Sequence, residues 1–186
     1  MRSALLLGDI GVSANGTDVS FREVAETLAP AVEDLVVACS DDRRETVVAA
    51  LEGVDYRLAV DPIADEGPVA AIRTGVRVAT GASVAVVAGD VPSVDVSLLA
   101  DLADACEDAA VPETDGRLHP LHAVYDAAAV RAACDHTLAS GSGRLYDVLS
   151  RLDPVVVAAD APDVDAHPLA TGARAHRTPA TDRLGT

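Results

Sequence analysis

Lysine and tryptophan are absent from this 186-residue chain, and aromatic residues of all kinds make up only 2% of it. All 14 basic residues are arginine, against 30 acidic residues, and the formal net charge is -16. This balance argues against nucleic acid and anionic membranes as partners, because phosphate groups are bound by clustered basic side chains. An acidic, lysine-free surface over a core of valine and alanine resembles the proteins of salt-loving archaea, where salt screens the self-repulsion. We therefore interpret the charge as a sign of a halophilic habitat.

Cysteine and long apolar runs are also scarce. The cysteines at positions 39, 106 and 134 are odd in number, far apart and without C-x-x-C spacing, which argues against a disulfide framework and a zinc site. We expect them to be buried small apolar residues. No apolar run reaches the length of about 18 residues that spans a membrane, and the N-terminus turns polar after Leu7; we therefore expect a cytoplasmic protein. The chain also lacks G-x-S-x-G and G-x-G-x-x-G, which disfavours a serine hydrolase and a Rossmann dehydrogenase.

Short apolar runs alternate with helical patterns through the first two thirds of the chain. Strands are predicted at 3–7, 35–38, 56–60 and 84–88, and helices after a capping box at Ser20 and over 42–53, 69–80 and 96–108. This alternation predicts a mostly parallel sheet with helices on both faces.

The last third changes character. A strand at 109–111, a turn at Asp115-Gly116 and a strand at 119–125 are close enough in sequence to be antiparallel, and helices over 127–139 and 144–152 precede a strand at 155–159. Residues 160–186 form a predicted loosely packed tail. The expected fold is a three-layer α/β/α domain with one antiparallel strand, and residues 1–186 are expected to form that single domain.

Residues 84–92, VAVVAGDVP, are the stretch around which the chain is organised. Their apolar run predicts a central strand that delivers Asp90 at its carboxyl end, which is where open α/β sheets bind ligands. Gly89 lets the backbone approach a ligand closely, and the Asp90 carboxylate can hold a hard cation such as Mg²⁺. The alternative is that Asp90 only caps the following helix.

Four motifs, by their order and spacing along the chain, resemble the molybdenum cofactor guanylyltransferases, the family of MobA. They are Gly67-Pro68 opening a helix, the strand-end Gly89-Asp90, LHPLHAVY at 118–125, and Ser142-Gly143-Arg144. The resemblance covers roughly residues 1 to 160. It implies a Rossmann-like nucleotide-diphospho-sugar-transferase-like fold and a Mg²⁺-dependent transfer of GMP from GTP to molybdopterin, with pyrophosphate released. It also implies molybdoenzyme maturation proteins as candidate partners.

The resemblance also implies roles for individual residues. Asp90 is similar to the family's catalytic aspartate, which contacts the metal and the nucleotide. Asp61 is similar to an acidic residue that contacts the nucleotide in the family, and Gly8 and Gly67 lie at positions where the family has nucleotide-binding glycines. Without the resemblance, Asp61 before Pro62 is simply a turn initiator, and Gly8 a plain turn residue.

Arg144 and His119 are candidate contacts to the second substrate or to phosphate. The alternative for Arg144 is a solvent-facing side chain in a loop. His119 and His122 could together suggest a metal site, but residues three apart on an extended strand face opposite sides, which disfavours it.

The chain departs from the family pattern in its first loop. Where the family has LAGG-x-S-x-R-M-G-x-D-K, this chain has LLLGDIGVSANGTDVSF, with no basic residue between Ser3 and Phe21. The asparagine expected after the second strand is replaced by Ala38 or Cys39, and a further glycine by Ala71. A triphosphate is held by glycine-loop amides and by cationic side chains. The alternative is therefore a catalytically degenerate homologue that acts as a binding or accessory protein in cofactor maturation.

Overall fold

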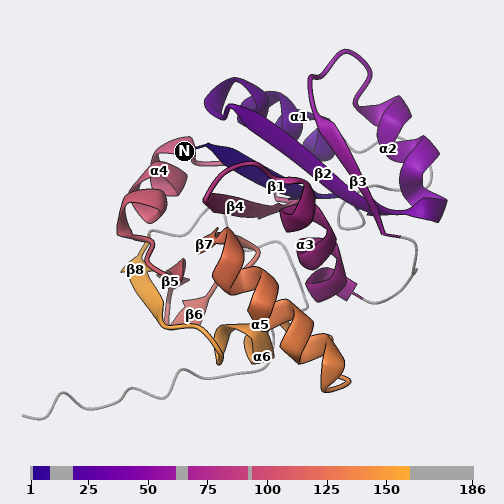
Figure 1. Cartoon of the computed structure of the whole chain (residues 1–186). Coiled ribbons are helices and arrows are strands. Elements are labelled where there is room, and N and C mark those ends of the chain that lie inside the picture. Colours follow the sequence, from indigo (N-terminus) through magenta and orange to yellow (C-terminus); the bar gives the residue numbers. More distant parts are fainter. Residues whose placement is uncertain (1, 9–18, 62–66, 92–93, 160–186) are drawn as a thin grey trace, which may run out of the picture.

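The computed structural model describes residues 2–8, 19–61, 67–91 and 94–159, and within them an eight-stranded sheet lies between two helical layers (Figure 1). The strands are β1 (Ser3–Leu7), β2 (Asp34–Ser40), β3 (Arg57–Asp61), β4 (Ser83–Ala88), β5 (Ala109–Thr114), β6 (Arg117–Leu118), β7 (His122–Asp126) and β8 (Pro154–Ala158). Their order is β3-β2-β1-β4-β7-β5-β6, and β8 pairs with β5. The ladders β3-β2-β1-β4 and β5-β8 are parallel, whereas β7 is antiparallel to β4 and β5.

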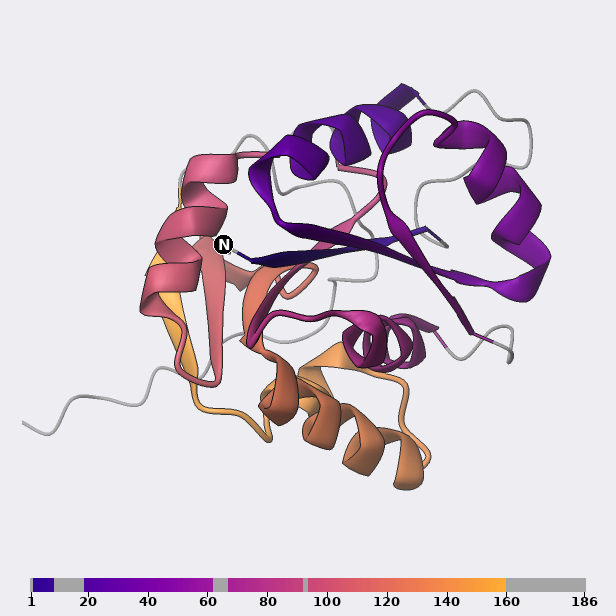
Figure 2. The same cartoon turned by 45° about the horizontal axis from the view of Figure 1, so that its top comes forward.

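Six α-helices of the described chain cover the two faces of the sheet (Figure 2). One face is covered by α1 (Val19–Leu28), α2 (Arg44–Ala50) and α4 (Val96–Ala105), and the other by α3 (Gly67–Val78), α5 (Ala127–Ala139) and α6 (Leu145–Leu149). Two short 3-10 turns, Ala29–Ala31 and Asp41–Arg43, flank β2. Successive strand residues point to opposite faces of the sheet. In β1, Leu5 packs on the face covered by α3, and Leu6 packs on the face covered by α1.

Local chemistry explains where several elements begin. The carboxylates of Asp95 and Asp126 accept backbone N–H groups of the first turns of α4 and α5, which are otherwise unpaired. Asp115 and Gly116 both have positive φ, 51° and 78°, as the tight turn between β5 and β6 requires.

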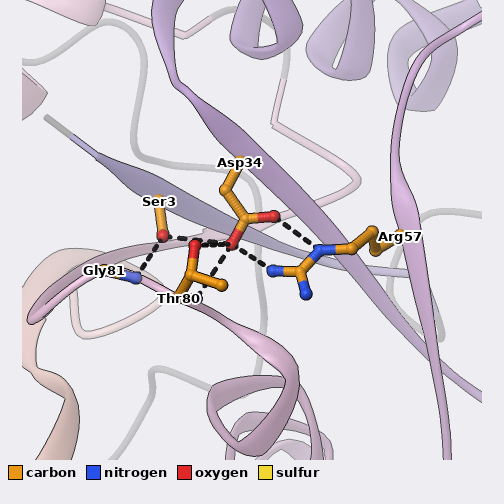
Figure 3. Close-up of polar contacts among 5 residues, drawn as sticks. All are labelled: Ser3, Asp34, Arg57, Thr80 and Gly81. Carbon is orange, nitrogen blue, oxygen red and sulfur yellow. Dashed lines mark hydrogen bonds and ion pairs between the residues drawn. The ribbon is translucent and has the colours of Figure 1, made fainter.

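A polar cluster ties together the edge of the sheet where the parallel strands start (Figure 3). Asp34 accepts hydrogen bonds from Arg57, from the Thr80 N–H at 2.9 Å and from the Thr80 hydroxyl at 3.0 Å. The Ser3 hydroxyl donates to Asp34 at 3.3 Å and accepts the Gly81 N–H at 2.9 Å. The cluster therefore joins β1, β2 and β3 to the turn that leads into β4.

The fold predicted from the sequence is confirmed in its main features. Helices lie on both faces of the sheet, the part formed by β3, β2, β1 and β4 is parallel, and β4 lies between β1 and β7 near the middle. The antiparallel strand predicted in the His119 region is β7, and the short β6 is also antiparallel to its neighbour β5. The helix predicted over 127–139 is α5. That the whole chain is a single domain stays a prediction, and the predicted tail at 160–186 lies outside the described residues.

Three local predictions were wrong. The strand predicted at 119–125 begins only at His122, because Pro120 has no N–H and the His122 N–H turns back to the His119 carbonyl at 3.0 Å. The helix predicted to run to Asp108 ends at Ala105, and Cys106 is already extended at the entry to β5. The first helix begins at Val19, so Ser20 lies inside it rather than at its cap.

The three cysteines are free, as predicted, but only two of them are fully buried. Cys39 and Cys134 lie in the core, whereas Cys106 is partly exposed. Within the described ranges, no helix combines the length and the apolar character needed to cross a bilayer.

Candidate functional site

The residues singled out from the sequence gather at one edge of the sheet, where the parallel strands end. Gly8 directly follows β1, Asp61 is the last residue of β3, and Asp90 lies two residues beyond β4. Because these strands are parallel and in register, their carboxyl ends share an edge. This edge is opposite to the one closed by the Asp34 cluster.

Asp61 is a buried carboxylate anchored to a helix. Its side chain accepts the hydroxyl of Thr74 on α3 at 3.2 Å, and the residue is only 4% exposed. A buried carboxylate needs such donors, since burial without them disfavours its charged form. The bond therefore fixes the end of β3 against the middle of α3.

Asp61 and Asp90 do not form a pair. The strands that carry them are separated by β2 and β1, which places them about 15 Å apart at strand spacings of about 4.8 Å. One ion cannot be held by both carboxylates directly. A ligand that contacted both Asp61 and Asp90 would have to span this distance along the edge.

Asp90 fits a magnesium ion bound mainly by its substrate. Among the described residues there is no group of three or more carboxylate, histidine or cysteine side chains that could hold a metal. Mg²⁺ commonly binds one or two carboxylates and completes its octahedron with phosphate oxygens and water. A half-buried carboxylate at the end of a central strand suits that role.

Gly8 has a packing role in the structure. Its N–H donates to the Ala38 carbonyl at 2.7 Å, so this amide is used within the sheet. A Cβ at this position would lie 3.1 Å from Cγ2 of Val47 and 3.2 Å from the Ala38 oxygen. Glycine is therefore favoured here by close packing, and a nucleotide contact at Gly8 stays a prediction.

Gly67 and Arg144 come from distant parts of the sequence and meet at the start of α3. Gly67 is the first residue of α3 and has a φ of 75°, which favours glycine. A Cβ placed on it would lie 4.0 Å from the carbonyl oxygen of Gly143, next to the exposed Arg144. The Arg144 N–H itself donates to the Ser142 hydroxyl at 3.2 Å. The N-terminus of α3 thus lies close to the backbone of the loop that carries Arg144, and a helix N-terminus with a nearby arginine suits an anion.

His119 lies in a loop that packs against the end of β4. The Ala88 N–H donates to the Leu121 carbonyl at 3.0 Å, so the loop borders Gly89 and Asp90. Two tyrosine hydroxyls hold it on either side of His119, Tyr146 by donating to the Leu118 carbonyl at 3.2 Å and Tyr125 to the Pro120 carbonyl at 2.7 Å.

Burial raises the pKa of both tyrosine hydroxyls that hold this loop, so both stay protonated and able to donate. His119 is 6% exposed, and its backbone N–H donates to the Pro112 carbonyl at 3.0 Å. Its position beside the strand end that carries Asp90 is therefore fixed by backbone and side-chain bonds.

His122 lies beside the start of α4. The Ser97 hydroxyl and the Leu98 N–H lower the pKa of Asp95, and the nearby charge of His122 contributes in the same direction. His122 is 1% exposed and is paired with Val87. It is therefore a buried residue at the start of β7, next to β4.

Arg73, which could have supplied positive charge to phosphates, is directed toward α5. Its guanidinium lies 4.0 Å from Asp135, which also pairs with Arg77 at 3.4 Å. Both arginines join α3 to α5. Arg144, which follows Gly143 in the loop near the α3 N-terminus, therefore remains a candidate cation.

Sequence reasoning missed Thr74, Tyr146 and the capping role of Asp95. The capping role of Asp95 could have been predicted, because an aspartate directly before an apolar helical pattern is a typical N-cap residue. Thr74 and Tyr146 had no local signal, since their partners are 13 and 28 residues away in the sequence.

A family profile and two related proteins all assign this chain to the same family. The sequence profile of the MobA-like NTP transferase domain matches residues 16–155. A protein named probable molybdenum cofactor guanylyltransferase from Natronomonas pharaonis is 41% identical over 75% of this chain and 70% of its own length. A protein of the same name from Haloferax mediterranei is 36% identical over 77% and 69%.

The fold has a similar match among solved structures. Molybdopterin-guanine dinucleotide biosynthesis protein A from Archaeoglobus fulgidus superimposes with a TM-score of 0.64 at 22% identity, covering 85% of this chain and 83% of that one. At this identity the match supports the fold alone. The profile match begins at residue 16, beyond the strand end that carries Gly8.

Proposed function

The chain belongs to the MobA-like NTP transferase domain family, and we propose that it transfers GMP from GTP to molybdopterin with release of pyrophosphate. The observation that carries this proposal is the single sheet edge shared by Asp61, Asp90, Gly67 and Arg144. The two relatives named for this activity are more than a third identical over most of the chain. Nucleotide and acceptor would lie along the same edge.

The reaction needs positioning rather than a covalent enzyme intermediate. An oxygen of the molybdopterin phosphate attacks the α-phosphorus of GTP, a new P–O bond forms, and the bond to the β-phosphate oxygen breaks. The leaving pyrophosphate carries the electron pair. The task of the protein is therefore to align two anionic groups and to offset their charge.

Each part of the edge has a role in that alignment. Asp90 would hold Mg²⁺, which offsets the charge of the phosphates when bound. The α3 N-terminus and Arg144 would bind an anionic group of the substrates. Asp61, held by Thr74 about 15 Å from Asp90, would contact the nucleotide away from the metal. His119, fixed beside the end of β4, would contact the second substrate or a phosphate.

The surface charge supports a halophilic setting. A net charge of -16 on a 19.0 kDa chain creates repulsion that salt screens. We therefore propose that the enzyme works at high ionic strength, and its assays belong in molar KCl.

One sequence feature favours a second candidate function. The first loop has no arginine or lysine between Ser3 and Phe21, so several expected phosphate contacts are missing. Contacts to charged groups contribute about 1.5 to 3 kcal/mol each, so the loss of several would weaken GTP binding by many orders of magnitude. A chain of this kind could act as a binding or accessory protein in cofactor maturation, with molybdoenzyme maturation proteins as partners.

The deciding experiment is an assay of the full chain with molybdopterin, GTP and MgCl₂ in molar KCl, followed by detection of the dinucleotide and of pyrophosphate. Parallel reactions with CTP and ATP identify the nucleotide. The catalytic proposal expects both products, and expects their loss with EDTA or with Asp90→Asn. Asp101→Asn, a change at an exposed site on α4, is the matched control. Absence of product together with absence of GTP binding by calorimetry would leave the accessory function.

A further inference from the structure

Strand β8 forms an edge of the sheet. It pairs in parallel with β5 through residues 154–158, and no other strand of the described residues pairs with it. Figure 1 shows β8 beside β5 at the outer border of the sheet. The opposite border is formed by β3.

The two border strands differ in charge. Strand β3 begins with Arg57 and ends with Asp61, and charged residues on edge strands discourage pairing with other chains. Strand β8 reads PVVVA and contains no charged residue, in a chain of which 24% is charged. Val155 and Val156 are 37% and 47% exposed. The β8 border therefore lacks the charge protection that the β3 border has.

The pairing of β8 with β5 decides which of its backbone groups face outward. The Ala159 N–H donates to the Glu113 carbonyl at 3.0 Å. Because backbone groups along a strand point alternately to its two sides, Val155 and Val157 also face β5, whereas Val156 and Ala158 face outward. Pro154 offers an outward carbonyl but no N–H.

We propose that β8 pairs with β8 of a second copy of this chain, antiparallel about a twofold axis at Val156. The N–H of Val156 in each copy donates to the carbonyl of Val156 in the other copy, so the two residues exchange two hydrogen bonds. Ala158 of each copy donates to the Pro154 carbonyl of the other. Every outward N–H of the strand then has an acceptor, and the missing N–H of Pro154 leaves only the Ala158 carbonyl of each copy without a donor in the ladder.

The second copy fits this border better than a charged partner would. The strand is self-complementary in its hydrogen bonds, as a twofold interface requires. In this register Asp153 of one copy lies opposite Ala159 of the other, so no two carboxylates are directly opposed. Salt screens the remaining repulsion between two chains of charge -16.

The pairing would extend the sheet without touching the candidate site. Strands β4 and β5 are both antiparallel to β7, so they run in the same direction. Strand β8 is parallel to β5 and therefore also runs in the direction of β4. An antiparallel β8 pair therefore places the two Asp90 edges at opposite sides of the joined sheet. Assembly and nucleotidyl transfer are separable, and this proposal does not depend on the proposed reaction.

The test is the mass of the full chain in molar KCl by light scattering. We expect a dimer of 19.0 kDa chains. Val156→Lys should shift the mass to the monomer, whereas Val48→Lys, at a valine of similar exposure on α2, should leave the dimer intact. Circular dichroism verifies that both variants fold. Molybdopterin guanylylation by a folded Val156→Lys monomer should match that of the wild type.

A second variant gives an independent readout. Val156→Cys should form an intermolecular disulfide on oxidation, because the twofold register brings the two positions within the Cα separation that a disulfide requires. Val48→Cys should not. A wild-type monomer at high protein concentration in molar KCl would overturn the proposal. So would a monomer in which the Val156 and Ala158 amides resist hydrogen exchange, since residues 160–186 or another segment would then cover the border.

Discussion

Arg57, at the start of β3, donates hydrogen bonds to both carboxylate oxygens of Asp34, at the start of β2, with Nε 2.7 Å from Oδ1. Burial alone would raise the pKa of Asp34, but the bonds from Arg57 and Thr80 outweigh it and lower that pKa below its ordinary value of 3.8. The ionised form of Asp34 is thus favoured in the folded state, and the pair joins two strands to the turn before β4.

The first prediction concerns pH. Because the pKa is lower in the folded state, Asp34 stabilises the protein above pH 3.8, and this contribution is lost as the pH falls through the folded pKa. Asp34→Asn should lower the free energy of unfolding by about 2 kcal/mol at neutral pH. The difference from wild type should vanish in strong acid. Urea unfolding in molar KCl across this pH range measures it, with Asp101→Asn as the exposed control. A difference that is independent of pH would contradict the assignment.

The second prediction concerns the support of Asp61. Thr74→Val keeps the shape of the side chain but removes the hydroxyl that donates to this buried carboxylate. We expect a loss of about 1 to 2 kcal/mol in unfolding free energy. If Asp61 contacts the nucleotide, GTP affinity measured by calorimetry should also fall. Thr74→Ser, which keeps the donor, should preserve most of the affinity. Equal affinities for the valine and serine variants would remove Thr74 as a positioning residue.

The third prediction concerns the contact between α3 and β1. A Cβ at Gly75 would lie 2.2 Å from Cδ1 and 2.7 Å from Cδ2 of Leu5, far closer than atoms can approach. Gly75→Ala should therefore destabilise the fold by about 1 to 3 kcal/mol through overpacking, although alanine favours a helix by about 1 kcal/mol over glycine.

A double-mutant cycle with Leu5→Ala isolates this contact. The smaller side chain at position 5 leaves room for a methyl group, so Gly75→Ala should be neutral or stabilising in that background. Unfolding free energies of the four proteins measure the coupling. Simple additivity of the two changes would show that Leu5 is not the obstacle.

The fourth prediction concerns salt. The repulsion among 30 acidic residues, opposed by only 14 basic ones, should weaken as ionic strength rises. The melting temperature should therefore increase from dilute buffer to molar KCl. Sucrose at equal osmolality serves as a control for excluded-solute stabilisation, which is independent of charge. A flat or falling melting temperature in KCl would contradict the halophilic interpretation.

The sequence allowed the strand-end positions of the site to be predicted. Asp61 and Asp90 each follow an apolar run and precede a turn, and parallel strands bring such ends to one edge. Their separation could not be predicted, because strand order is set by tertiary packing. Nothing local in the sequence places β2 and β1 between β3 and β4.

The region around His119 shows a different kind of failure. One continuous strand was predicted over 119–125, but Pro120 and the backbone bond from His122 to His119 divide the segment into a turn and a strand. The argument that the two histidines face opposite sides of a strand therefore does not apply. Both are buried, and the loop that carries His119 is held by long-range bonds such as that of Tyr146 to Leu118.

The position of β1 between β2 and β4 has a consequence for folding on the ribosome. Strands β1, β2 and β3 lie within residues 3–61 and can pair as soon as they are synthesised, but the second edge of β1 is closed only by β4, at 83–88. Until then that edge exposes unpaired backbone groups, and Leu5 lacks its cover by α3 around Gly75. The nascent chain is thus most prone to aggregate between these two points of its synthesis, and β4 is the element whose arrival ends that period.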